Sequence, residues 1–201
     1  MPNKSKTKTG SREKILNAAQ ALFAEKGFHK TTTSEIASSA GVAEGTIFKN
    51  FSNKENLLFA LVDEIDTGNI YSLLQLAVNE ETRPTLREFL KKHMAMVLNN
   101  FNLLKITLYE AQFFPELKNK FIEEVALNIF TPLENFIENK SNTGEFKDIN
   151  PQIAARSFAG MIVAFIAWEN ILQAGEYQSF DKIEVIENVL EIFLSGIKQT
   201  G

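Results

Sequence analysis

The sequence of 201 residues contains no cysteine and only two histidines, His29 and His93. Without cysteine, the chain cannot form disulfide bonds, thiolate metal sites or a cysteine nucleophile. The two histidines lie in unrelated segments, and neither has a cluster of acidic residues beside it. We therefore expect no enzyme, no metal site and no cofactor, because no catalytic constellation is visible.

Long apolar runs are missing as well. No apolar segment follows Met1, so a secretory signal is not expected. The longest nearly apolar stretch, residues 157–168, has about 12 residues, whereas roughly 20 are needed to cross a bilayer. We expect a cytoplasmic protein that does not span a membrane.

The charge of the chain is unevenly distributed. Its net charge is −4, yet residues 1–54 carry nine lysine and arginine residues against four acidic ones, and residues 55–201 carry 12 against 21. A basic segment joined to an acidic one is expected where one end of a protein meets a polyanion. Residues 1–10, with Lys4, Lys6 and Lys8, are expected to form a disordered basic arm.

Apolar residues recur at helical spacing throughout the chain, and no segment shows the alternation of a β-strand. An all-α fold follows from this pattern. The first helix is expected to begin with Ser11 as its cap and to end at Gly27. Further helices are expected over residues 85–99, which follow Pro84, and over residues 103–111.

Three helices are expected in the second half of the chain, each beginning with a proline or a capping residue. Pro115 is expected to begin a long helix that Pro132 kinks, and Asn150 is expected to cap the next helix. That helix is apolar on nearly all sides, and the last helix, capped by Asp181, carries a wide apolar stripe. Faces this apolar must be enclosed, which suggests a homodimer formed through the two C-terminal helices.

Residues 31–54 have the pattern of a helix-turn-helix. Thr32 and Glu35 form a capping box, and Gly41 permits a sharp turn after the helix that they start. In the next helix, Ile47 must face inward, and so must Phe51, four residues later. Ser52, with a glutamate three residues later, is expected to cap the helix that follows.

Three segments then resemble the tetracycline-repressor (TetR) family: R-x-x-I-L-x-A-A-x-x-L-F-x-x-x-G over 12–27, T-T-x-x-I-A over 32–37, and A-G-V-A-E-G-T-I-F-K-N-F-x-x-K-E over 40–55. The resemblance implies a homodimeric regulator, usually a repressor, that a small molecule releases from a palindromic operator in double-stranded DNA. It implies a helix-turn-helix domain over 11–54 and an effector-binding and dimerisation domain over 55–201. The residues implied to contact DNA are Thr33, Ala43, Glu44, Gly45, Thr46, Phe48, Lys49 and Asn50, with Lys54 on a flanking phosphate.

The chemistry of these residues agrees with DNA contact. The Thr33 and Thr46 hydroxyls lie beside helix N-termini, where phosphate contacts are favourable. Lys49 can donate to guanine and Asn50 can pair with adenine, contacts worth about 1–3 kcal/mol of base discrimination. Glu44 either accepts from cytosine or is a first-turn acidic residue favoured by the helix dipole. Many relatives carry serine in place of Ala43 and tyrosine in place of Phe48, so two hydroxyls are lost here.

Family architecture places an effector pocket among the middle helices. The expected lining residues are apolar and aromatic: Phe101, Leu104, Leu108, Tyr109, Phe113, Phe121, Met161, Phe165 and Trp168. Glu110, Gln112, Glu169 and Asn170 are expected at its rim, although ordinary core packing is expected to hold most of the 17 phenylalanines. Such a pocket favours a small hydrophobic effector.

Two further alternatives remain open from the sequence. His93 is either a hydrogen-bonded core residue or a polar group of the pocket, and His29 is expected to be a residue of a connector between helices. The acidic second domain, finally, could bind a protein partner instead of an effector, which would make the chain a DNA-tethered interaction protein.

Overall fold

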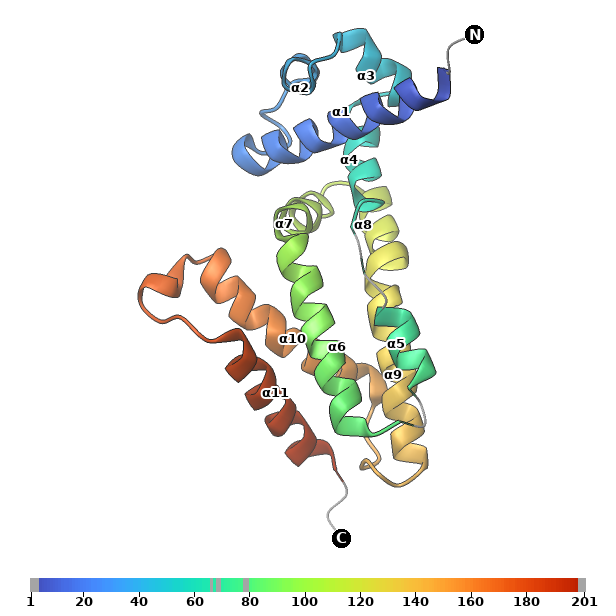
Figure 1. Cartoon of the computed structure of the whole chain (residues 1–201), viewed down its shortest axis with the longest axis vertical. Helices are drawn as coiled ribbons and strands as arrows, with labels where there is room; N and C mark the ends of the chain where they lie inside the picture. The colour runs from blue at the N-terminus through green and yellow to red at the C-terminus, as the bar shows by residue number, and fades with distance from the viewer. Residues whose placement is uncertain (1–3, 66, 68–69, 78–79, 199–201) are drawn as a thin grey trace. The chain divides into compact units, whose positions relative to one another are not determined.

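The computed structural model describes residues 4–65, 67, 70–77 and 80–198 of the chain. The described residues form helices and connecting segments, with no β-strand among them, so the expected all-α fold is confirmed (Figure 1). The α-helices are α1 (Lys4–Lys26), α2 (Thr33–Ala40), α3 (Glu44–Asn50), α4 (Lys54–Val62), α5 (Ile70–Leu76), α6 (Thr82–Asn99), α7 (Phe101–Glu110), α8 (Pro115–Phe121), α9 (Leu127–Asn142), α10 (Pro151–Asn170) and α11 (Lys182–Ile197). A π-helical turn, η1 (Ile122–Ala126), joins α8 to α9, and a 3₁₀ turn, η2 (Ala174–Glu176), follows α10.

The chain divides into two compact units that are not contiguous in sequence. Unit 1 comprises Met1–Asp66 and Asn100–Val125, and unit 2 comprises Thr67–Asn99 and Ala126–Gly201. The segment 11–54, which we predicted as a helix-turn-helix domain, lies wholly within unit 1. The segment 55–201, which we predicted as one effector and dimerisation domain, contributes to both units.

The core of unit 1 forms around α1, which packs against α2, α3, α4 and α7. Figure 1 shows α1 lying across the short helices α2 and α3. The predicted inner face of α1 is buried, and Ile15 and Ala19 are fully enclosed together with Ile36 of α2 and Ile47 of α3. This core fixes the positions of α2 and α3 relative to α1.

The N-terminus of α1 differs from our prediction. The helix begins at Lys4 and not at Ser11, so residues 4–10, expected as a disordered arm, are helical. Extending an existing helix adds one hydrogen bond for each residue that becomes fixed, which is far easier than nucleating a new helix. Gly10 lies inside the helix and lowers its stability by only about 1 kcal/mol relative to alanine.

Two expected helix starts are also wrong. Asn53 caps α4, because its side-chain oxygen accepts from the Asn56 amide at 2.7 Å. The Ser52 hydroxyl, which we expected in this role, accepts instead from the Asn56 side chain. Helix α6 begins at Thr82, so Pro84 lies inside its first turn. A first-turn residue has no intrahelical partner for its N–H, so proline is tolerated there.

The long helical segment after Pro115 begins as predicted, with proline at the first position of α8. A π-helical turn, Ile122–Ala126, which we did not expect, interrupts the segment. Pro132 lies within α9, where it is buried. The chain passes from unit 1 to unit 2 within this π-helical turn.

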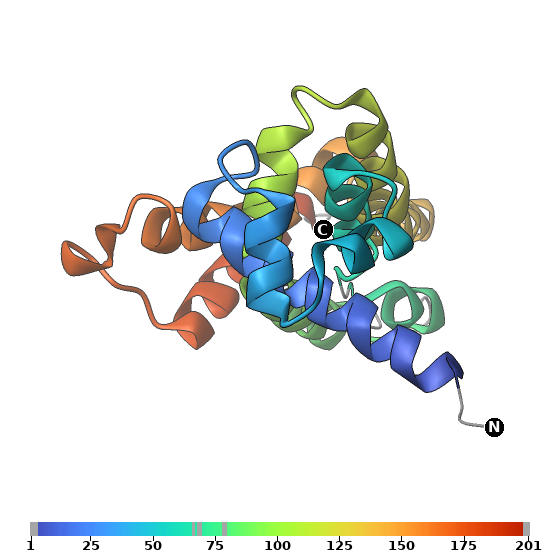
Figure 2. The same cartoon turned by 90° about the horizontal axis from the view of Figure 1, so that it is seen from above.

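Unit 2 is built on α6 and α10. Helix α10 packs against α6, α9 and α11, and α5 packs between α6 and α9. Figure 2 shows the segment around η2, between α10 and α11, on the opposite side of this unit from α5 and α9. Aromatic rings link the helices: Phe158 stacks on Phe89 with a centroid distance of 5.9 Å and meets Phe193 at 4.2 Å. These phenylalanines are core residues, as expected for most of them.

Helix α10 is the one described helix that is long and apolar enough to cross a membrane. Its buried residues pack within unit 2, against three other helices, as in the core helix of a globular domain. The predicted caps of α10 and α11 are both present, because Asn150 accepts from two backbone amides and Asp181 does the same.

His93 is buried on α6, and its ring stacks on Phe89 at a centroid distance of 5.6 Å. Burial lowers the pKa of His93 to about 4, and the nearby Ala159 backbone opposes this shift only weakly. Neither ring nitrogen forms a hydrogen bond of acceptable geometry with a described residue. Burial therefore makes His93 a neutral core residue near pH 7.

Candidate nucleic-acid interface

The turn between α2 and α3 has the geometry that the sequence predicts. The Thr32 side chain accepts from the Glu35 amide while Glu35 accepts from the Thr32 amide, which completes the capping box of α2. Gly41 adopts the left-handed conformation, with φ of 65°, and its N–H caps the end of α2. Helix α3 then starts at Glu44 with its inner residue Ile47 fully buried.

Glu35 is also the carboxylate of a surface ion pair. Its pKa is lowered to about 2 by the Lys26 ammonium, 2.9 Å away, and by the hydrogen bonds from Thr32. The same contact raises the pKa of Lys26. The start of α2 is thus joined to the last turn of α1 as well as being capped.

The residues expected to contact DNA lie on the outer side of this motif. Ala43, Glu44, Gly45, Phe48 and Lys49 are exposed. Thr33, Thr46 and Asn50 are half-buried. Phe48 is 52% exposed, which is unusual for a large aromatic side chain and leaves its ring available to sugar or thymine methyl groups. Helix α3 supplies six residues of this set and Ala43 is its N-cap residue, whereas α2 supplies Thr33 and α4 supplies Lys54.

Gly45 is not explained by the packing of the protein. A Cβ atom at this position would meet nothing within 4 Å, and Gly45 does not have the positive φ of Gly41. Glycine inside a helix is less favourable than alanine by about 1 kcal/mol. A residue that weakens α3 without serving the fold is consistent with a close approach of the backbone to a partner outside the chain.

Two of the polar side chains are engaged within the motif. The Thr33 hydroxyl donates to Glu44 at 2.6 Å, which joins the N-termini of α2 and α3. The Asn50 side-chain amide donates to the Thr46 carbonyl at 2.8 Å. Glu44 therefore has a structural partner. The single hydroxyl proton of Thr33 must leave Glu44 before Thr33 can donate to DNA, whereas Asn50 still has a second amide proton and its side-chain oxygen.

Lys54, which we expected on a flanking phosphate, makes contacts within the protein. Its ammonium donates to the Phe28 and Thr31 carbonyls, each at 2.9 Å, and lies 4.4 Å from the centre of the Phe28 ring. Phe28 and Thr31 belong to the connector between α1 and α2, residues 27–32. Lys54 thus holds this connector against α4.

The residues expected to line an effector pocket are divided between the units. Six of them belong to unit 1 and Met161, Phe165 and Trp168 to unit 2. None of the nine is buried: Leu108, Tyr109, Phe113 and Trp168 are exposed and the others half-buried. Phe165 and Trp168 line a cavity of about 310 Å³ in unit 2, together with Ala164, Gln178 and Phe180.

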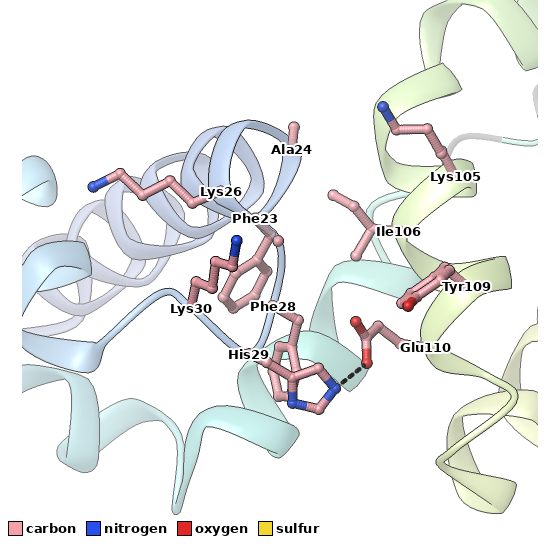
Figure 3. A pocket seen from close by; sticks show the side chains of 11 residues that line it. Phe23, Ala24, Lys26, Phe28, His29, Lys30, Lys105, Ile106, Tyr109 and Glu110 are labelled. Atoms are coloured by element: carbon pink, nitrogen blue, oxygen red, sulfur yellow. Dashed lines mark ion pairs between the residues drawn. The ribbon is translucent and has the colours of Figure 1, made fainter. Parts of the chain in front are cut away.

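A second cavity, of about 360 Å³, lies in unit 1 between the end of α1, the connector 27–32 and α7. Figure 3 shows His29 and Glu110 directed toward each other at this cavity, which Tyr109 also lines. The His29 Nε2 atom lies 3.2 Å from Glu110 Oε2. We expected His29 in a connector, as found, but placed Glu110 at a pocket rim, whereas it is buried. The two residues lie 81 positions apart in the sequence, so no local sequence pattern could indicate their contact.

Comparisons with known proteins identify relatives of both halves of the chain. Residues 15–61 match the family described as bacterial regulatory proteins, tetR family, and residues 84–196 match the AefR-like transcriptional repressor, C-terminal domain. The fatty acid metabolism regulator protein of Bacillus subtilis is 29% identical over 188 residues, covering 91% of this chain and 93% of that protein.

Solved structures have the same fold. The FadR regulator of Bacillus subtilis in complex with stearoyl-CoA is 28% identical, with a TM-score of 0.70, and covers 92% of this chain and 98% of its own. A TetR-family regulator from Mesorhizobium loti, with a TM-score of 0.71 and 21% identity, covers 96% of this chain and 98% of its own. The C-terminal match alone spans more than half of the chain. The C-terminal domain resembles that of AefR-like repressors. The protein therefore belongs to the TetR family of ligand-responsive, DNA-binding transcriptional regulators, as the resemblance of its N-terminal motifs had implied.

Proposed function

We propose that this chain is a homodimeric repressor that binds a palindromic operator and is released from it by a long-chain fatty acyl thioester. The observation that carries the proposal is the similarity, over more than 90% of both chains, to a fatty acid metabolism regulator and to a structure that contains stearoyl-CoA. Since the similarity extends through the C-terminal segment, it includes the part of the chain expected to bind the effector. A cytoplasmic location would suit this function.

The proposed DNA contacts combine base reading with backbone contact. Lys49 is exposed and can reach guanine, and Asn50 can read adenine with its second amide proton and its side-chain oxygen. Thr33 and Thr46 are the proposed phosphate contacts, while exposed Phe48 replaces a hydroxyl by an apolar contact. Because α3 has only seven residues, these few side chains carry the sequence preference.

The proposed effector contacts come from apolar side chains that the fold leaves incompletely covered. All nine expected pocket residues retain solvent exposure, although they are apolar or aromatic. Exposure of this kind is typical of surfaces that bind a ligand or a partner. At the cavity of unit 2, an acyl chain would cover Phe165 and Trp168 without needing a fixed charge in the protein.

The proposed dimer interface uses α10 and α11. Both helices carry large apolar side chains that are exposed in the single chain, including Ile153 and Val163 on α10 and Ile183 and Ile192 on α11. A second copy of this chain would bury them. The spacing of the two recognition helices in such a dimer must match successive major grooves, about 34–36 Å apart.

The experiment is an operator-release assay with the purified protein. Genomic fragments retained by the protein supply the operator, and binding of the labelled fragment is followed by fluorescence anisotropy. Stearoyl-CoA is expected to release the fragment at micromolar concentration, whereas free coenzyme A is not. Retention of the fragment at saturating stearoyl-CoA, with no rise in the melting temperature of the protein, would reject the acyl thioester as effector.

A further inference from the structure

The cavity of about 360 Å³ in unit 1 has no part in the proposed repressor function. It lies between the end of α1, the connector 27–32 and α7, all of which belong to unit 1. Its volume is at the lower end of the range of small-molecule sites, about 300–1,000 Å³. Phe23, Phe28 and Ile106 are buried residues that line it, so part of its lining is apolar.

A buried carboxylate faces this cavity. Glu110, the last residue of α7, lines the cavity, and its side chain is only 3% exposed. Its Oε2 atom accepts no hydrogen bond from a described residue. The exposed His29 ring has a nitrogen 3.2 Å from this atom but forms no hydrogen bond with it. Because a buried carboxylate without a donor is unfavourable, Oε2 is an acceptor that a ligand can use.

Positive charges lie around the same cavity. Lys26, Lys30 and Lys105 line it, and all three are exposed. Lys26 is paired with Glu35, and Figure 3 shows its side chain directed away from Glu110. Lys30 and Lys105, by contrast, make no ion pair or hydrogen bond with a described residue. The cavity therefore combines a buried acceptor with two exposed ammonium groups that can bind an anion.

The charges of the cavity favour a ligand that carries both signs. A simple cation would be attracted by Glu110 but repelled by Lys30 and Lys105, and the reverse holds for a simple anion. A molecule with an ammonium and a carboxylate avoids both repulsions. Its N–H groups can donate to Glu110 while its carboxylate accepts from the lysines, and such charge-assisted hydrogen bonds are the stronger ones.

We propose that the cavity of unit 1 is a second ligand site, which binds a free α-amino acid with an apolar side chain. The ligand ammonium donates to Glu110, its carboxylate faces Lys30 and Lys105, and its side chain contacts the apolar lining. This class of ligand differs from the proposed acyl thioester, because a buried carboxylate would repel the phosphate groups of coenzyme A. The connector 27–32 ends at Thr32, the cap of α2, so the bound amino acid would hold the start of the DNA-binding motif against α7.

A ligand titration of the full-length protein tests the proposal. It is made without operator or acyl thioester, so its outcome does not depend on the proposed repressor function. The probes are L-phenylalanine and L-leucine, each with the amine and the carboxylic acid of the same side chain. At least one amino acid is expected to bind at millimolar concentration and to raise the melting temperature. The matching amine and acid should each bind about tenfold more weakly, since each lacks one charged group.

Three variants locate the binding. Glu110→Gln retains the shape of the side chain but removes its charge, and should weaken amino acid binding by about tenfold or more. Ala24→Leu places a larger apolar side chain in the cavity from half-buried Ala24 on α1, and should abolish binding while the protein stays folded. Thr107→Val is the matched control, because Thr107 is a buried residue of α7 whose hydroxyl also lacks a hydrogen bond, yet it does not line the cavity. Its binding should equal that of the wild type.

Replacement of both Lys30 and Lys105 by glutamine should weaken binding of the amino acid more than binding of the matching amine. Failure of both amino acids to bind at millimolar concentration would overturn the proposal. Binding that Glu110→Gln and Ala24→Leu leave unchanged would overturn it as well, because the amino acid would then lie elsewhere. An amine that binds as tightly as its amino acid would exclude the contact of the ligand carboxylate with the lysines, and with it the proposed class of ligand.

Discussion

Replacement of Lys54 by methionine separates a structural role from a DNA contact. Methionine retains the aliphatic reach of the side chain but removes the ammonium that holds the Phe28 and Thr31 carbonyls. Hydrogen bonds to a charged group contribute about 1.5–3 kcal/mol each, and a cation–π contact about 0.5–2 kcal/mol. Because the three contacts share one ammonium and the carbonyls are only partly buried, water recovers part of this loss. A net destabilisation of about 2–3 kcal/mol is expected.

For a chain of this length, 1 kcal/mol corresponds to about 2–4 °C, so Lys54→Met should melt roughly 4–12 °C below the wild type. Thermal unfolding is followed by circular dichroism at one fixed protein concentration, since the proposed dimer would make the melting temperature depend on concentration. Hydrogen exchange should locate the loosened amides in the connector 27–32.

Lys49→Met is the matched control for this experiment. Lys49 is exposed on α3 and makes no hydrogen bond or ion pair among the described contacts, so its replacement should leave the melting temperature unchanged and weaken operator binding. A Lys54→Met protein that melts within about 1 °C of the wild type while losing operator affinity would refute the reasoning and restore the phosphate contact.

Three further perturbations follow from the structure. Gly45→Ala should raise stability by up to about 1 kcal/mol, because its Cβ meets open space, and yet weaken operator binding; an unchanged operator affinity would show that the backbone makes no close approach. The Glu35 pKa, lowered from 4.5 to about 2, implies stabilisation that is complete above pH 4.5 and lost as the pH falls toward 2, so Glu35→Gln should flatten the acid limb of the stability profile measured by urea unfolding. Ile192→Lys, at a 63% exposed position on α11, should shift the dimer toward monomer in sedimentation velocity, and an unaltered dimer would exclude this face.

Local patterns predicted the helix-turn-helix well because its determinants are local. The capping box of Thr32 and the left-handed Gly41 depend on residues within a few positions of each other, and both are present. The inward direction of Ile47 follows from helical periodicity alone. Ser52 and Asn53 are both suitable helix caps, and the local sequence did not show that Asn53 would cap α4.

The roles of individual polar side chains were less predictable. Lys54 carries a charge that suits phosphate, but only the fold shows two carbonyls of a distant connector within 2.9 Å of it. Glu110 was expected among the polar groups at the rim of an effector pocket; it is buried, lines the cavity of unit 1 and lies 3.2 Å from His29. Side chains of this kind are assigned by long-range packing, which periodicity and capping rules do not describe.

The discontinuous composition of unit 1 bears on the construction of chimeric regulators. Helices α7 and α8, from residues 100–125, belong to the same compact unit as α1 to α4. A chimera joined at residue 54 would therefore contain α2 and α3 without α7 and α8, which belong to the same compact unit. We expect operator preference to be transferred to another regulator more reliably by exchanging the exposed residues of α3 alone than by exchanging residues 1–54 as one segment.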